Sequence, residues 1–527
     1  MKLLYAHWMQ ELDTETIDGL GIPSIVLMEN ASRGAADFFS EIFPLPLYQN
    51  VVVVAGKGNN GGDGLAIGRI LFQKGYHVEF MLLATPEKLN PDPKINHDIL
   101  TRLHLPITII ADNTDFPRMA GILEKYQPAD TFIVDALFGT GLNAPVKSGL
   151  YAETIHLISQ SPFKVAAVDL PSGLSESFLP EEGPHVSAHA TATFQCLKLA
   201  HLYPDGNMYC GTIRVIDIGI PHHFIARDKY YIHLSQPDTF TALFGKRQLD
   251  AHKGSYGHCL TLCGSIEKPG AGILSSYAVL KSGAGLCTVA VCPENRTIAT
   301  TVHPELMTLI FQENSDWLAR LKEFDVVLAG PGLGDNDKTA TMVTQMLQQV
   351  ESPLVLDADA LNVLQRQPLK ELLKLRLSQH PVIITPHLRE FSRLTGVDVP
   401  EIRRNRIPIG RTFAREFNVY LVLKGHHTMI ITPAGQVFVN PTGNAGMATA
   451  GSGDVLSGVI AGMVAQFART QPLAVILQAA VFIHGYAGDL AVGETGEMSL
   501  TATDIIRYIP EAIQSLDEYR SPFQFTR

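Results

Sequence analysis

The segment Asn440-Pro-Thr-Gly-Asn-Ala-Gly-Met-Ala-Thr-Ala-Gly-Ser-Gly-Asp-Val-Leu-Ser-Gly458 places four glycines ahead of one carboxylate. From Val455 onward the apolar residues recur at helical spacing. We therefore expect Gly451–Gly453 at a helix N-terminus, where free N–H groups and the helix dipole attract an anion. A carboxylate beside a bound phosphate can accept the proton of a hydroxyl that attacks a phosphoryl group. The segment predicts a phosphoryl-transfer site with Asp454 as general base; a glycine-rich turn without an active role is the alternative.

Composition excludes several classes of protein. The chain has 527 residues, 46% of them hydrophobic and 18% charged, which indicates two or three globular domains. A net charge of −11 without a Lys or Arg run argues against a nucleic-acid partner. The N-terminus lacks a signal-peptide pattern, and no run of about 18 uninterrupted apolar residues predicts a membrane span. Six cysteines without a Cys-x-x-Cys pair are typical of buried thiols, and we expect a cytoplasmic protein.

Two series of apolar strands alternate with helical stretches, which predicts α/β architecture in both halves. The first includes Val51–Ala55, His77–Ala84, Thr131–Asp135 and Lys164–Asp169; the second runs from Leu260–Gly264 to Tyr420–Lys424. Residues 221–246 between them are irregular. We therefore predict one domain over residues 1–228 and a second over residues 229–527.

The first series contains the glycine-rich segment Gly56–Gly64 between a strand and a helix that we expect over Leu65–Lys74. It has the form Gly-x-Gly-x-x-Gly, and Glu79 follows 23 positions after Gly56, so a dinucleotide-binding Rossmann site is one interpretation. Polar side chains within the loop, and the strand-end carboxylates Asp135 and Asp169, instead favour a cation site or proton transfer.

Four motifs of the first half resemble the NAD(P)HX epimerase domain, in that family's order: Met28–Ala31, Gly56–Gly64, Asp135–Leu142 and Val168–Gly173. The resemblance implies a Rossmann-like three-layer fold. It also implies that a hydrated nicotinamide nucleotide is contacted by Asn59, Asn60, Gly61, Gly62, Asp63, Gly139, Thr140, Gly141, Leu142, Asn143, Ala144, Pro145 and Asp169, and that Asn60, Asp135 and Ser172 surround a potassium ion. Because Asp169 ends a buried strand beside the glycine loop, we predict that it is the catalytic residue of this half.

A second set of motifs, over about residues 236–516, resembles the NAD(P)HX dehydratase domain, which has a ribokinase-like fold. The set includes His252–Gly257, Gly330–Gly334, Asp357–Asn362, Thr385–His387, Lys424–Thr428 and the opening segment. The resemblance implies that Ala271, Gly334, His387 and Asp454 contact the hydrated nucleotide, and that Lys424, Gly425, His426, His427, Thr428 and Gly453 contact the adenine nucleotide.

Both halves together resemble the family of bifunctional NAD(P)H-hydrate repair enzymes. This implies epimerisation of the R and S forms of NADHX and NADPHX, followed by dehydration of the S form. Phosphorylation would turn the hydroxyl of the hydrated ring into a good leaving group, and donation from the ring nitrogen would then expel phosphate. The fused architecture favours ADP over ATP as the donor, giving AMP and phosphate. The expected cofactors are K⁺ and Mg²⁺, and we expect a homo-oligomer with no nucleic-acid or membrane partner.

The sequence departs from the dehydratase pattern at two places. Leu388-Arg389-Glu390 replaces Pro-Gly-Glu after His387, and Gly270-Ala271-Gly272 replaces Gly-Ala-Ala. The first places a bulky cation near the substrate loop. Two other interpretations stay open: a ribokinase-like small-molecule kinase fused to a nucleotide-binding module, and an N-terminal regulatory module whose carboxylates are silent.

Overall fold

The computed structural model describes residues 1–310, 317–366, 369–377 and 379–525. It divides into two compact units: one contains Lys2–Tyr230 and the last residues from Arg520, and the other contains Met1 and Tyr231–Tyr519. The boundary lies two residues from the predicted one. The prediction that the second domain extends to residue 527 is wrong, because the C-terminal strand β20 (Phe523–Phe525) pairs with β9 (Thr212–Ile216) of the first unit.

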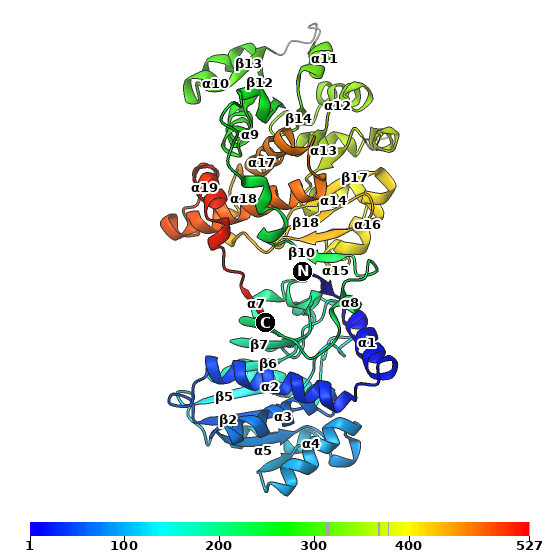
Figure 1. Ribbon diagram of the computed structural model, residues 1–527, viewed down its shortest axis with the longest axis vertical. Coiled ribbons are helices and arrows are strands. Elements are labelled where there is room, and N and C mark those ends of the chain that lie inside the picture. The colour runs from blue at the N-terminus through cyan, green and yellow to red at the C-terminus, as the bar shows by residue number, and fades with distance from the viewer. Residues whose placement is uncertain (311–316, 367–368, 378, 526–527) are drawn as a thin grey trace. The chain divides into compact units, whose positions relative to one another are not determined.

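The first unit contains an entirely parallel sheet in the order β20-β9-β7-β6-β5-β2-β3-β4. Its remaining strands are β7 (Ala190–Phe194), β6 (Lys164–Val168), β5 (Thr131–Ala136), β2 (Asn50–Ala55), β3 (His77–Leu82) and β4 (Ile107–Ile109). Hydrophobic residues run through these strands because helices cover both faces. The predicted three-layer α/β fold is confirmed (Figure 1).

Alternate residues of β2 point to opposite helical layers. Val52 and Val54 pack in a cluster with α5 (Phe116–Leu123) and α6 (Leu150–Gln160). On the other face lie α2 (Ser24–Ile42), α3 (Asn59–Gln73) and α4 (Pro91–Arg102), with α3 in contact with β2, β3 and β5.

The helix α3 begins at Asn59 and not at Leu65 as predicted, so most of the expected glycine loop is its first turns. The glycines allow this close approach. A Cβ on Gly61 would lie 1.9 Å from the Gly56 carbonyl oxygen, and one on Gly64 would lie 2.3 Å from the Ala136 Cβ. Glycine normally weakens a helix interior, but here it lets α3 pack directly against the strand ends.

The second unit contains a sheet in the order β10-β19-β18-β17-β16-β15-β14-β11-β12-β13, parallel except that β18 runs antiparallel to both neighbours. The strands are β10 (Ile232–Leu234), β19 (Val437–Val439), β18 (Met429–Ile431), β17 (Val419–Leu423), β16 (Val382–Ile384), β15 (Leu354–Leu356), β14 (Val326–Ala329), β11 (His258–Leu262), β12 (Leu286–Val291) and β13 (Met307–Ile310). The expected α/β architecture of the second half is therefore confirmed.

Four helices form a large hydrophobic core with this sheet: α9 (Pro269–Lys281), α17 (Ser452–Phe467), α18 (Leu473–Thr495) and α19 (Ala502–Gln514), the last three orange to red in Figure 1. Within the described residues α18 alone is long and apolar enough to cross a membrane. Since 72% of its apolar window is buried in the fold, it is accounted for as a core helix. All six cysteines are free, and five of them are buried.

Candidate active sites

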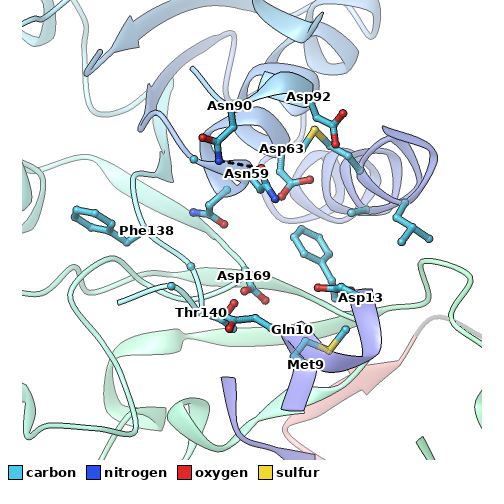
Figure 2. Close-up of a pocket in the computed structure, with 18 of the residues that line it drawn as sticks. Met9, Gln10, Asp13, Asn59, Asp63, Asn90, Asp92, Phe138, Thr140 and Asp169 are labelled. Carbon is cyan, nitrogen blue, oxygen red and sulfur yellow. Dashed lines mark hydrogen bonds between the residues drawn. The ribbon is translucent and has the colours of Figure 1, made fainter. Parts of the chain in front are cut away.

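A cavity of about 750 Å³ lies at the carboxyl end of the first sheet, where ligand sites of open α/β sheets form. Several predicted residues line it: Asn59, Asn60, Asp63, Gly139, Thr140, Gly141 and Asp169. Figure 2 shows Asp63 facing the cavity from α3, and Asp13 and Asp169 facing it from other elements. Gly139 lies close to two other predicted site residues. A Cβ added to it would lie 2.9 Å from Asn60 Oδ1 and 3.0 Å from Asp169 Oδ2.

Asp169 is held by a buried lysine. The Lys198 ammonium donates hydrogen bonds to Asp169 Oδ1 at 2.6 Å, to Thr193 Oγ1 at 2.9 Å and to the Phe194 carbonyl at 2.8 Å. The Lys198 side chain is 1% exposed, and its three N–H groups match these three acceptors. Burial alone would raise the pKa of Asp169, but Lys198 and the Thr193 hydroxyl bring it below its ordinary value. Asp169 is therefore ionised at neutral pH.

The backbone around Asp169 is held as well. Asp169 has a φ of +63°, which is uncommon for a residue with a side chain and is a strained conformation. His201 Nε2 donates to the Asp169 carbonyl at 2.8 Å, while His201 Nδ1 accepts from the Lys198 N–H at 2.9 Å. Burial lowers the pKa of His201 to about 4, so the ring is neutral with its proton on Nε2. These contacts fix the strand end that presents the carboxylate.

Two further carboxyl groups face the same cavity, and their pKa values are raised where that of Asp169 is lowered. Asp63, on α3, is 8% exposed, and burial together with the charge of Asp169 raises its pKa well above the ordinary value. Asp13, on α1 (Ala6–Thr14), has its pKa raised to about 6 by burial, against the attraction of Lys198. The cavity thus combines a carboxylate whose pKa is lowered with two carboxyl groups whose pKa values are raised, an arrangement suited to acid–base chemistry.

The predicted potassium ligands Asp135 and Ser172 are in contact. Ser172 donates from its backbone N–H to Asp135 Oδ2 at 2.8 Å and from Oγ to Asp135 Oδ1 at 2.6 Å. Asp135 is fully buried, and burial raises its pKa to about 6; the groups that oppose this shift are hydrogen-bond donors of Ser172 and Leu137, not cations. Asn60 Nδ2 is buried without a hydrogen-bond partner. Oxygen ligands around a buried carboxyl group whose charge is balanced by no side-chain cation fit a monovalent cation.

Other predicted residues of this half lie outside the cavity lining. Gly61 and Gly62 are buried in α3, and the loop Leu142–Pro145 does not contribute to the wall. Glu79, the acid of the Rossmann interpretation, accepts a hydrogen bond from the Tyr126 hydroxyl at 2.8 Å within β3. Glu79 thus bonds to Tyr126 and does not line the cavity, which argues against the Rossmann interpretation.

In the second unit α17 begins at Ser452, and Gly451 has a φ of +87°, so the predicted helix N-terminus is confirmed. Asp454 lies in the first turn and is half-buried. Burial and the negative charge of Asp357 raise the pKa of Asp454 to about 7, although Lys424 opposes the shift. Asp454 can therefore accept a proton near neutral pH and release it again.

Lys424 places a cation beside that helix N-terminus. Its ammonium donates to Asp357 Oδ1 at 2.7 Å and lies 4.0 Å from Glu390 Oε2. A Cβ added to Gly453 would lie 3.4 Å from Lys424 Nζ, which puts the ammonium next to the amides that would hold a phosphoryl group. Burial opposes its charge, but Asp357 and Glu390 raise the pKa of Lys424 above its ordinary value.

The loop Lys424–Thr428 connects β17 to β18. His427 is buried with a φ of +53°, and its Nδ1 lies 3.1 Å from the Asn440 carbonyl oxygen, to which it must donate. Its Nε2 is buried without a partner, and burial lowers the pKa of His427 to about 3. Thr428 Oγ1 closes the loop by donating to the Gly425 carbonyl at 3.1 Å, and the His426 carbonyl accepts from Arg406 at 3.1 Å.

His387 has a structural contact that the sequence does not reveal. It is the N-cap of α14 (Leu388–Thr395), where its Nδ1 accepts from the Arg389 and Glu390 N–H groups at 3.1 Å each. Glu390 Oε2 in turn accepts from the His387 N–H at 2.8 Å. Since Nδ1 is an acceptor, a neutral His387 carries its proton on Nε2, which is then the nitrogen that can donate to a ligand.

A second cavity, of about 480 Å³, borders Gly334. Its lining includes Lys268, Leu333, Asn336 and Lys338. The Gly334 N–H donates to Asp359 Oδ2 at 2.7 Å, and Gly334 has a φ of +89°. A Cβ on Gly332 would lie 2.9 Å from the Ala271 Cβ, so the two predicted substrate segments adjoin.

Sequence reasoning did not predict Asp13, Lys198, His201 or Asp357 as site residues. Lys198 had one available signal, since it follows Cys196-Leu197 and precedes Leu199-Ala200 as a single charge in an apolar run. Asp13 lies more than 150 positions from Asp169, and nothing in its own segment distinguishes it from a solvated helix residue.

Comparisons with known proteins cover both units. A family model described as YjeF-related protein N-terminus matches residues 24–200, and one described as NAD(P)H-hydrate dehydratase matches residues 259–511. The chain is 36% identical over 530 residues to the bifunctional NAD(P)H-hydrate repair enzyme Nnr of Moorella thermoacetica, covering 98% of both chains. It is also 36% identical to the protein of that name in Coxiella burnetii, covering 97% of this chain and 99% of the other.

Among solved structures, the ADP/ATP-dependent NAD(P)H-hydrate dehydratase of Bacillus subtilis, co-crystallized with ATP/Mg²⁺, is 28% identical. The match covers 54% of this chain and 98% of that one, with a TM-score of 0.48.

Proposed function

We propose that this chain, which belongs to the family of bifunctional NAD(P)H-hydrate repair enzymes, interconverts the epimers of hydrated NADH and NADPH and dehydrates the S epimer. The observation that carries the proposal is the match over 98% of the chain, with both matched regions holding a site. The kinase alternative leaves the carboxyl-lined cavity of the first unit without a role.

For the dehydratase, we propose that Asp454 accepts the proton of the ring hydroxyl while the hydroxyl oxygen attacks the terminal phosphoryl group of ADP. AMP leaves, the ring nitrogen lone pair then expels phosphate, and the proton on the adjacent ring carbon is lost, which gives NADH. The amides of Gly451–Gly453 are suited to hold the phosphoryl oxygens. Lys424 supplies the neighbouring positive charge that stabilises charge developing in the transition state.

The two ions are part of the proposal. In phosphoryl-transfer sites Mg²⁺ is bound largely by phosphates and water, so we propose that it enters with the nucleotide. No cluster of three or more His, Cys, Asp and Glu side chains that could hold a metal occurs in the described part of the chain. A potassium ion needs no such cluster. We propose that oxygen atoms of Asp135, Ser172 and Asn60 hold it, and that its charge would offset the buried Asp135 carboxylate.

For the epimerase, we propose that the ionised Asp169 is the essential carboxylate. It stabilises the positive charge that develops on the ring when the hydroxyl leaves, which a carboxylate held by Lys198 and Thr193 does without taking up a proton.

The test is incubation of the protein with hydrated NADH and either ADP or ATP. We expect free phosphate to be released in step with recovery of the reduced-nicotinamide absorbance, faster with ADP. A stable phosphoester without recovered NADH would favour the kinase alternative. Asp169→Ala should leave one epimer unconsumed, whereas rapid consumption of both epimers by this variant would contradict an essential role.

A further inference from the structure

The helix α1 covers the cavity of the first unit and presents an unassigned carboxyl group to it. Met9, Gln10 and Asp13 line the cavity from this helix (Figure 2). The strand preceding α1, β1 (Leu3–Leu4), pairs in parallel with β8 (Leu197–Lys198), the strand that carries the buried lysine. Asp13 is thus tied to the framework that holds Asp169.

The position of α1 is fixed at several points around the cavity. Glu176 Oε1 accepts from the Ala6 N–H at 2.7 Å at the start of the helix. Beyond its end, Arg227 makes two hydrogen bonds to Glu15, at 2.6 and 2.7 Å. The five residues after the helix, Glu15–Gly19, form a π-helical turn, a feature frequent at functional sites. Such contacts keep a cavity-facing side chain in place.

The three cavity carboxyl groups differ in their partners. Asp169 Oδ1 accepts from Lys198 and from Thr193, so that carboxylate is committed to the ionised state. Burial and the charge of Asp169 raise the pKa of Asp13, against the attraction of Lys198. Burial and the charges of Asp169, Asp13 and Asp92 raise the pKa of Asp63, again against Lys198. Asp63 faces the cavity from α3 and Asp13 faces it from α1 (Figure 2).

Epimerisation at the hydroxyl-bearing carbon beside the ring nitrogen requires chemistry on both faces of the ring. The C–O bond breaks with assistance from the nitrogen lone pair, and the leaving oxygen takes a proton and departs as water. A water molecule then adds to the opposite face and gives up a proton. One water leaves and one is added, so one acid and one base suffice.

Resting on the proposed epimerase function, we propose that Asp13 and Asp63 are the acid–base pair of this site, one serving each face of the ring, while Asp169 stabilises the cationic intermediate. One of the pair enters the cycle protonated and the other ionised. The member that starts ionised takes a proton from the incoming water, so the two carboxyl groups end with their protonation states exchanged. That exchanged state is the one from which the reverse reaction starts.

A second acidic residue on α1, Glu11, supplies a matched control. Glu11 lies on the same helix as Asp13, is 51% exposed and is not part of the cavity lining. The full-length protein is incubated with the R epimer of hydrated NADH and no nucleotide, so that dehydration cannot consume the product, and formation of the S epimer is followed by chromatography.

We expect Asp13→Asn to lower kcat about 100-fold to 10,000-fold with little change in KM, the range for loss of a positioned acid or base. Glu11→Gln should match wild type. In the wild type, the rate should fall as the pH drops below about 6, where Asp13 becomes protonated, and the Asn variant should lack that limb.

Failure of wild type to form the S epimer would contradict the proposed function itself. A wild-type rate in Asp13→Asn, with active wild type, would overturn the inference about Asp13 alone. If Asp13→Asn unfolds, Asp13→Glu decides the matter. A folded Glu variant with a rate reduced at least about 10-fold and a displaced pH profile supports the inference, and a wild-type rate and profile overturns it.

Discussion

Replacing Lys198 with Met should destabilise the first unit strongly, because it removes one partner of a buried ion pair. Met has a similar length without the charge, and Lys198 is 1% exposed, so the change places an apolar group at a buried position. Asp169 would keep the Thr193 hydroxyl but lose the donor at 2.6 Å. Breaking a buried pair from one side costs about 3–5 kcal/mol. For a unit of roughly this size, that lowers its melting temperature by about 6–20 °C.

A double-mutant cycle tests whether this loss comes from the pairing. Asp169→Asn alone leaves the Lys198 ammonium with Thr193 and the Phe194 carbonyl and should also be destabilising. In Lys198→Met/Asp169→Asn neither charge remains buried, so the double variant should be more stable than the sum of the single effects predicts, by at least about 1–2 kcal/mol. Urea unfolding of all four proteins, followed by circular dichroism, measures the free energies. Additivity within about 0.5 kcal/mol would refute the reasoning.

The pH dependence supplies a second check on the same pair. The folded-state pKa of Asp169 is lowered, so its stabilising contribution is complete above its unfolded pKa and is lost as the pH falls through the folded pKa. In Lys198→Met, burial would raise the pKa of Asp169 in the folded state, so this variant should regain part of its lost stability as the pH falls and Asp169 takes up a proton, whereas the wild-type pair loses stability.

Three further outcomes are expected. Asp454→Asn should slow dehydration about 100-fold to 10,000-fold, because asparagine cannot accept the hydroxyl proton, while calorimetry shows retained ADP binding; near-normal turnover would contradict the general-base role. With the pKa of Asp454 raised to about 7, the wild-type dehydration rate should fall as the pH decreases below about 7, and rates measured across this range should show no such limb in Asp454→Asn. Removing residues 520–527 deletes β20, the partner of β9, and should lower the urea midpoint of the first unit and slow epimerisation, with dehydration of the pure S epimer unchanged. An unchanged urea midpoint would show that β20 adds no stability.

The strands and the start of helix α17 could be predicted because each depends on a local sequence pattern. Continuous apolar runs mark buried parallel strands, and glycines followed by helical spacing mark the start of α17. The start of α3 could not be predicted this way. The five glycines of Gly56–Gly64 favour a loop on intrinsic propensity, and only the packing of Gly61 against Gly56 and of Gly64 against Ala136 explains a helix there.

In the first unit, the carboxylates at strand ends could be predicted as site residues. Asp135 lies near the end of β5 and Asp169 directly follows β6, so the sequence places them at one edge of the sheet. Asp13 and Lys198 reach that edge through the pairing of β1 with β8, two strands of two residues each, which have no readable periodicity. The N-cap contact of His387 likewise depends on the tautomer and the turn geometry, which residue type alone does not determine.

The return of the chain end to the first sheet has a consequence for biosynthesis. Because β20 is the last strand and its partner β9 ends at Ile216, the ribosome adds about 300 residues between the two halves of one strand pair. Until residues 523–525 have left the ribosome, β9 is an open sheet edge able to pair with another chain. Premature termination before β20 would therefore release chains with a complete dehydratase core and an epimerase sheet whose β9 edge is unpaired.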